Sequence, residues 1–185
     1  MSRAGTAHPI GTPAETLAPF GPRSTANASA RRWLAVAAGG AAAGVAIALV
    51  SQHRFGLQPC PWCVLQRLIF LVFALVATLG SLGHSRLLHR FSVGIGLMLV
   101  LAGAAAALWQ HFQAAASASC SMTFADKIIS RTLELDSLLP AVFEPRASCA
   151  DAAVNLLGVP YDFWSLGLFV ALGLMMLRVL HRSPG

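Results

Sequence analysis

Residues 60–82 read CPWCVLQRLIFLVFALVATLGSL, in which two cysteines stand directly in front of a long apolar run. The run from Val64 to Leu82 has 19 residues and one charged side chain, Arg67. A helix that rises about 1.5 Å per residue needs about 20 such residues to cross the roughly 30 Å hydrocarbon core of a bilayer. The stretch therefore predicts a transmembrane helix that begins at Cys60-Pro61-Trp62-Cys63.

The whole chain has the composition of a membrane protein. It is 56% hydrophobic and 11% charged, with a mean hydropathy of +0.67, whereas soluble domains carry about a quarter charged residues. Backbone groups in lipid must be paired within their own segment, so each apolar run is expected to be a helix. We predict an all-α membrane protein, a four-transmembrane-helix bundle over residues 31–182, after a disordered arm of residues 1–30. The predicted spans are about 33–51, 64–82, 91–112 and 163–180.

Positive charge is distributed unevenly about these spans. The side that holds both termini carries eight arginines, and the opposite side carries Arg54, Lys127, Arg131 and Arg146 among acidic residues. By the positive-inside rule, both termini are cytoplasmic and loops 52–63 and 113–162 are periplasmic. All four cysteines then face the oxidising side of a bacterial inner membrane. The charges form no basic stripe interleaved with aromatic residues, so nucleic acid is not a predicted partner.

The first cysteine pair is predicted to lie at a helix start. Pro61 suits the first helical position because it lacks an amide hydrogen. Cys60 then caps the helix, and the positive end of the helix dipole stabilises a thiolate on Cys63. Arg67 lies one turn further on the same face, where an arginine needs an anion, a polar ligand or the lipid headgroups. Snorkelling to the membrane surface is the alternative role of Arg67.

Other uses of a Cys-x-x-Cys pair fit less well. A c-type haem site requires a histidine directly after the second cysteine, where this chain has Val64. Zinc would need four converging ligands, and an oxidising compartment works against thiolate ligands, so no metal site is predicted. Two structural disulfides in a non-enzymatic protein are the main alternative. A bridge across two intervening residues, however, closes too small a loop to constrain the unfolded chain much.

The second cysteine pair, Cys120 and Cys149, lies in the long loop and encloses 28 residues. Between them, Asp126–Leu139 has apolar residues at roughly helical spacing, which predicts a short amphipathic helix on the membrane surface or against the span ends. Either placement holds Cys149 near the first pair. Cys120 lies in a run of small residues, which suits attack by the thiolate of another protein.

These residues together resemble the DsbB family, bacterial inner-membrane enzymes that make disulfides and pass the electrons to quinone. The resemblance covers about residues 31–182. It rests on the following features: Gln52-His53, Pro59-Cys60-x-x-Cys63 with Arg67, the Cys120/Cys149 loop, and Asn155–Gly158 with Pro160 leading into Trp164.

The resemblance implies a protein-dithiol:quinone oxidoreductase. A periplasmic DsbA-like thiol oxidase would attack Cys120 and release Cys149, which would exchange with Cys60. The Cys63 thiolate would then pass electrons to ubiquinone or menaquinone, with Arg67 supporting the charge and His111 near the quinone ring. An enzyme of the vitamin K epoxide reductase type is the alternative within the same chemistry. Those enzymes generally place their Cys-x-x-Cys late in the bundle.

Overall fold

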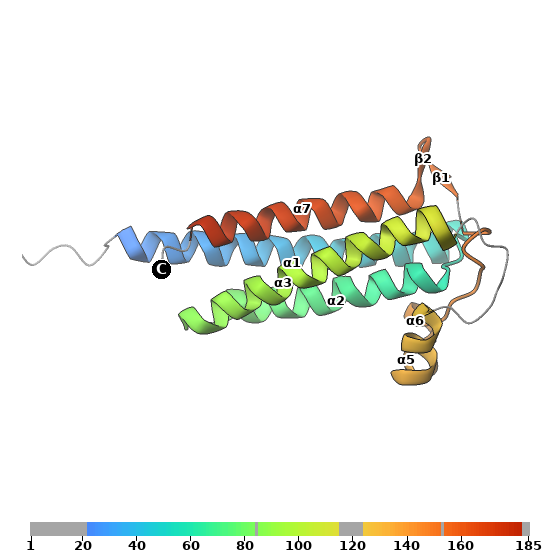
Figure 1. The fold of residues 1–185 in the computed structure, drawn as a ribbon, viewed down its shortest axis with the longest axis horizontal. Coiled ribbons are helices and arrows are strands. Elements are labelled where there is room, and N and C mark those ends of the chain that lie inside the picture. Colours follow the sequence, from blue (N-terminus) through green and yellow to red (C-terminus); the bar gives the residue numbers. More distant parts are fainter. Residues whose placement is uncertain (1–21, 84, 115–123, 153, 183–185) are drawn as a thin grey trace, which may run out of the picture.

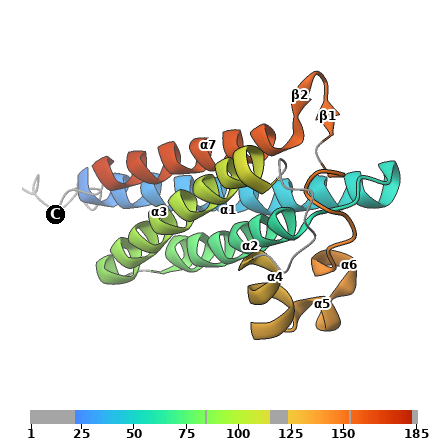
Figure 2. The same ribbon diagram turned by 45° about the vertical axis from the view of Figure 1, so that its right-hand side comes forward.

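The computed structural model describes residues 22–83, 85–114, 124–152 and 154–182, and four long helices make up most of it (Figures 1 and 2). Each of the four is long and apolar enough to cross a membrane, so the predicted four-helix membrane bundle is confirmed. Each helix begins before its predicted span, and the first and last helices also end after theirs. The four helices are α1 (Pro22–Phe55), α2 (Pro61–Leu82), α3 (Arg86–Trp109) and α7 (Tyr161–Arg182).

Helix α1 begins within the segment predicted as a disordered arm. Residues 22–30 are helical, and Ala30 is buried. Arg31 Nε donates a 2.6 Å hydrogen bond to the carbonyl of Ser81 near the end of α2. This contact ties the start of the bundle together outside the predicted span. Residues 1–21, the rest of the predicted arm, lie outside the described residues.

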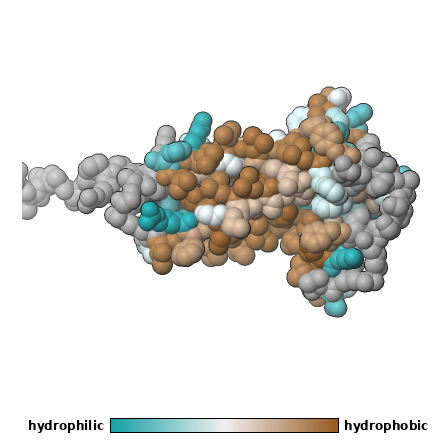
Figure 3. Space-filling model, viewed as in Figure 1, coloured by the Kyte–Doolittle hydropathy of each residue, from teal (hydrophilic) through white to brown (hydrophobic). Residues whose placement is uncertain are grey.

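The four long helices pack in a ring around one apolar core. Helix α1 contacts α2 and α7, and α3 contacts the same two helices. The rings of Phe70 and Phe169 stack across the middle with their centroids 4.1 Å apart. The face of the bundle in Figure 3 is apolar along its middle and has hydrophilic residues towards its ends, as expected for helices surrounded by lipid. The largest buried core side chains are Leu34, Phe73, Phe169, Leu172 and Met176.

Glycines permit the close approach of neighbouring helices. A Cβ atom on Gly44 of α1 would collide with Leu168 of α7, and one on Gly103 of α3 would collide with the ring of Phe169. Small residues at such contacts are typical of membrane helices, which associate through close packing rather than through the hydrophobic effect. The missing side chains at these two glycines therefore let α7 pack closely against both α1 and α3.

The connection from α3 to α7 is made of short pieces. A π-helical turn (Gln110–Ala114) ends α3, and a second π-helical turn (Lys127–Thr132) follows α4 (Phe124–Asp126). Two further turns, α5 (Leu135–Leu138) and α6 (Pro140–Phe143), lie beside the bundle near the cysteine end (Figure 2). A hairpin of β1 (Asn155–Leu156) and β2 (Val159–Pro160) then leads into α7.

The amphipathic segment predicted over Asp126–Leu139 is thus helical but broken. Glu134 adopts a left-handed conformation with φ of 48°, which separates the π-helical turn from α5. Leu139 leaves the helical region, with φ of −137° and ψ of 67°, because helical backbone is disfavoured for the residue before a proline, here Pro140. The break lets α5 and α6 fold back beside α2.

The Gly103 contact leads to a stability prediction. We expect Gly103→Ala to destabilise the bundle by roughly 1–3 kcal/mol, because the added methyl group overlaps the buried ring of Phe169. Thermal unfolding in detergent measures the effect. Gly94→Ala on the same helix is the matched control, since nothing lies within 4 Å of its added Cβ. Equal melting temperatures for the two variants would contradict this account of the packing.

Candidate functional site

The cysteine pair occupies the first turn of α2 as predicted. Cys60 is the N-cap, Pro61 is the first helical residue, and the backbone N–H of Cys63 donates to Cys60 Sγ at 3.3 Å. The two sulfur atoms are 2.9 Å apart. Cys60 is fully buried, whereas Cys63 is partly exposed. The pair therefore holds Cys60 inside, whereas Cys63 lines a cavity.

Cys149 lies against the buried member of this pair. The segment before it is tied to the first loop, because the carbonyl of Pro59 accepts hydrogen bonds from the amides of Arg146 (3.0 Å) and Ala147 (3.3 Å). Hydrogen bonds with Cys149 and with Cys63, together with burial, raise the pKa of the Cys60 thiol well above its usual range. Cys60 is thus held as a neutral thiol between two other sulfur atoms.

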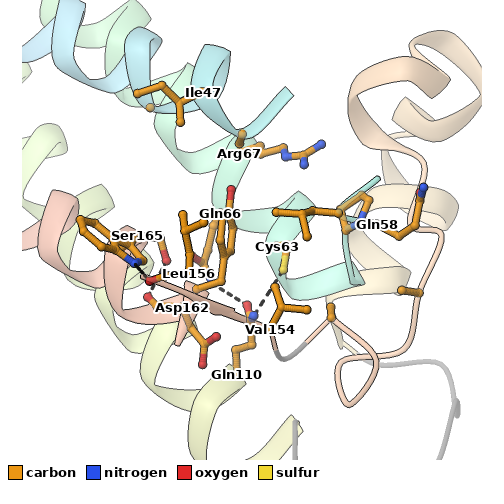
Figure 4. Close-up of a pocket in the computed structure, with 18 of the residues that line it drawn as sticks. Ile47, Gln58, Cys63, Gln66, Arg67, Gln110, Val154, Leu156, Asp162 and Ser165 are labelled. Carbon is orange, nitrogen blue, oxygen red and sulfur yellow. Dashed lines mark hydrogen bonds between the residues drawn. The ribbon is translucent and has the colours of Figure 1, made fainter. Parts of the chain in front are cut away.

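A cavity of about 430 Å³ opens beside Cys63 (Figure 4). It lies among α1, α2, α7 and the connections at this end of the bundle. Its walls reach down to Gly44, which precedes the end of α1 at Phe55 by eleven residues, or about 16 Å along a helix axis. The cavity therefore extends into the membrane-spanning part of the bundle. Its apolar lining includes Ile47, Phe70, Val154, Trp164 and Leu168.

Arg67 lines the same cavity and points into the protein. Its side chain is 6% exposed, so it does not snorkel to the surface. Its Nη1 donates to Gln52 Oε1 of α1 at 2.7 Å and to the carbonyl of Val142 in α6 at 3.0 Å. Both bonds use Nη1, which leaves Nε and Nη2 without a hydrogen-bond partner in the described part of the chain. The guanidinium also acts electrostatically on Cys63 and Cys60.

Two buried glutamines complete the polar wall. Gln66 Nε2 of α2 donates to Gln110 Oε1 at 2.8 Å, and Gln110 Nε2 donates to Cys63 Sγ at 3.3 Å. Figure 4 shows Gln110 between Gln66 and the sulfur atom. Both glutamines line the cavity. The sulfur atom of Cys63 therefore has an amide donor on the α3 side.

A histidine–aspartate pair lies at the edge of this site. His111 Nδ1 is 2.8 Å from Asp162 Oδ2, and the ring of His111 packs on that of Phe163 with centroids 4.6 Å apart. Asp162 is buried and lines the cavity, whereas His111 is not among the lining residues. Among the described residues, Asp162 connects His111 to the cavity.

Comparison with known proteins shows to which family the chain belongs. A family model described as "Disulfide bond formation protein DsbB" matches residues 30–179. The chain belongs to the DsbB family. Its match spans most of the described bundle, including the Cys60–Cys63 turn, Arg67 and the loop that carries Cys149.

Relatives of this DsbB-family chain carry the name "Disulfide bond formation protein B". That of Polaromonas naphthalenivorans is 32% identical over 157 residues, which are 82% of this chain and 92% of the relative. That of Stutzerimonas stutzeri is 31% identical over 160 residues, or 84% of this chain and 97% of the relative. "Disulfide bond formation protein B 2" of Pseudomonas aeruginosa is 32% identical over 143 residues, or 75% and 82% of the two chains. The DsbB-family chain is accordingly a multi-pass membrane oxidoreductase of disulfide bond formation.

The structure brings together four of the six predicted site residues. Cys60, Cys63, Arg67 and Cys149 lie at one end of the bundle, and His111 lies one contact further away. Cys120 falls outside the described residues. The proposed quinone contact of His111 stays a prediction.

Sequence reasoning did not identify three polar residues of this DsbB-family site. Gln110 and Asp162 appear in the sequence as a polar residue before a histidine and as a loop acid. Gln52 was noted only as part of the family resemblance. The signal available in the sequence was their position at the ends of apolar spans. Polar residues at such positions tend to face the interior of the bundle, where they find hydrogen-bond partners.

The raised pKa of Cys60 predicts unequal reactivity in the reduced protein. A thiol attacks as its thiolate, and a pKa raised above the pH of the experiment leaves the group protonated. At pH 8 we expect iodoacetamide to alkylate Cys63 at least about tenfold faster than Cys60. Peptide mapping by mass spectrometry gives the two rates.

Protein unfolded in detergent is the control for this comparison, because both cysteines should then react alike. Equal rates in the folded protein would show that Cys60 is neither buried nor held as a neutral thiol.

Proposed function

We propose that this DsbB-family protein oxidises the dithiol of a periplasmic DsbA-like thiol oxidase and passes two electrons to a membrane quinone. One observation carries the proposal. The sulfur atom of Cys63 lines a cavity within the membrane-spanning helices, while its partner Cys60 contacts Cys149 of the long loop. A chain of sulfur atoms therefore leads from the loop towards the lipid level.

The cavity fits the head of a quinone. Its volume lies within the range of about 300–1,000 Å³ that is usual for small-molecule sites. Apolar and aromatic walls, including Phe70 and Trp164, suit a planar ring and an attached isoprenoid chain. The Nε and Nη2 donors of Arg67 suit a carbonyl oxygen. A quinone bound there supplies the electron acceptor that the thiols need.

The exchange steps use only the four cysteines and the partner. A thiolate of the reduced partner attacks Cys120 of a Cys120–Cys149 disulfide, and Cys149 leaves. Cys149 attacks Cys60 of a Cys60–Cys63 disulfide, and Cys63 leaves as a thiolate. The second thiol of the partner then displaces Cys120, which in turn displaces Cys60 from Cys149. The partner has become a disulfide, and Cys60 and Cys63 have become thiols.

The reaction balances when the Cys60–Cys63 pair is reoxidised. Two thiols lose two electrons and two protons as they form a disulfide, and the quinone takes up both and leaves as the quinol. Cys63 is suited to act as the leaving and donating sulfur, because it lies at the positive end of α2 and near the Arg67 guanidinium. The buried thiol of Cys60 then closes the disulfide from 2.9 Å away.

Replacement of Cys63 or Arg67 tests this function. We expect Cys63→Ala to abolish quinone reduction driven by a reduced DsbA-like partner. Arg67→Met should slow it about ten- to hundredfold, through the loss of hydrogen bonds from a charged donor. Quinone absorbance follows the rate. Arg90→Ala, at the opposite end of the bundle, is the matched control.

A single-turnover measurement separates the two halves of the reaction. Oxidised Arg67→Met protein should still oxidise one equivalent of partner without quinone, because thiol exchange does not use the cavity. Full quinone reduction by Cys63→Ala would refute the assignment of Cys63 as the electron-donating sulfur atom, whereas no quinone reduction by the native protein would favour a protein with two static disulfides.

Placement of the cysteine end in the periplasm of the bacterial inner membrane leads to a labelling prediction. With the four native cysteines replaced by alanine, Leu157→Cys should react with a membrane-impermeant maleimide in intact spheroplasts. Ser85→Cys, in the turn at the other end, should react only after permeabilisation. Both residues are exposed, so access decides the outcome, and the reverse pattern would overturn the proposed orientation.

A further inference from the structure

We propose that Gln110 is a further catalytic residue, whose side-chain amide stabilises the Cys63 thiolate, and that Gln66 is a positioning residue that keeps this amide turned towards the sulfur atom. The inference deepens the proposed function, because it rests on Cys63 as the sulfur atom that donates electrons. Its evidence is a line of two hydrogen bonds, from Gln66 to Gln110 at 2.8 Å and from Gln110 to Cys63 Sγ at 3.3 Å (Figure 4).

The buried environment strengthens these two hydrogen bonds. Gln66 and Gln110 are 4% and 3% exposed, and they line a cavity whose other walls include Phe70, Trp164 and Leu168. In such surroundings a hydrogen bond to a charged sulfur atom is stronger than in water, because water does not compete for it. A negative charge on Cys63 is therefore matched by a donor that does not move when the charge forms, which is the arrangement that lowers the cost of charge development.

The direction of the Gln110 amide is the critical point. A primary amide has a donor end and an acceptor end of nearly the same shape. With its oxygen towards Cys63, Gln110 would repel a thiolate instead of stabilising it. In the structure Gln66 Nε2 donates to Gln110 Oε1, and Gln110 Nε2 accordingly faces the sulfur atom of Cys63.

The two glutamines also come from different elements, α2 and the π-helical turn that ends α3, and are separated by 44 residues in the chain. The donor to Cys63 is thus set by helix packing and not by the local turn that carries the cysteines. Arg67 lies on the side of α1 and α6, so the amide and the guanidinium approach Cys63 from different directions.

Gln110→Met and Gln66→Met test the inference, because methionine nearly keeps the volume of glutamine and removes the hydrogen bonds. The readout is the rate of Cys63 alkylation as a function of pH in the reduced full-length protein, measured with iodoacetamide and peptide mapping. We expect Gln110→Met to raise the pH of half-maximal alkylation by about half to one unit. Gln66→Met should raise it by the same amount or less.

The double variant separates a relay from two independent effects. If Gln66 acts only through Gln110, the Gln66→Met/Gln110→Met protein shows the same midpoint as Gln110→Met alone. Additive shifts, or no shift in Gln66→Met, would overturn the positioning role. No shift in Gln110→Met would overturn the whole proposal.

Controls keep the outcome decisive. Ser92→Ala removes a buried polar side chain from the same helix, α3, at its other end, and should leave the midpoint unchanged. If Gln110→Met does not accumulate, Gln66→Met decides alone, and an unchanged midpoint counts against the proposal. The assay uses neither quinone nor partner protein, so a failure of quinone reduction leaves its result intact.

Discussion

A guanidinium held below the surface of a membrane protein must be satisfied from within, and much of the site is arranged around that of Arg67. Its two hydrogen bonds reach Gln52 in α1 and the carbonyl of Val142 in α6. A hydrogen bond from a charged donor contributes about 1.5–3 kcal/mol, so losing either partner would leave the guanidinium less well satisfied. The same residue that faces the cavity therefore also fastens the long connection to the bundle.

The apolar residues are divided between two clusters with different tasks. The larger one fills the bundle from Ala30 to Val179 and gives a rigid frame. The smaller one contains Cys60 and Cys149 together with Val64, Ile129 and Phe143, so it packs the connection against the start of α2. The position of Cys149 is thus a matter of side-chain packing, and the loop that carries it behaves as part of the folded structure.

Local signals in the sequence were sufficient for the four spans, for Cys60 as a helix cap and for Arg67 on the face of Cys63. Each depends on residues within a few positions of one another. The contact between Gln110 and Cys63 spans 47 residues and depends on how α3 is rotated against α2, which hydropathy does not specify. The break at Glu134 escaped prediction for another reason, since a left-handed glutamate has no turn signal of its own. The role of Cys120 rests on the family resemblance.

The two hydrogen bonds that the carbonyl of Pro59 accepts should affect the rate of thiol exchange between Cys149 and Cys60. They join the first loop to the residues just before Cys149, so that this sulfur atom need not search for Cys60 by diffusion. Holding the two thiols close together in this way raises the effective molarity of one at the other. In the relay proposed above, the arrival of the partner protein is then expected to be slower than the internal exchange.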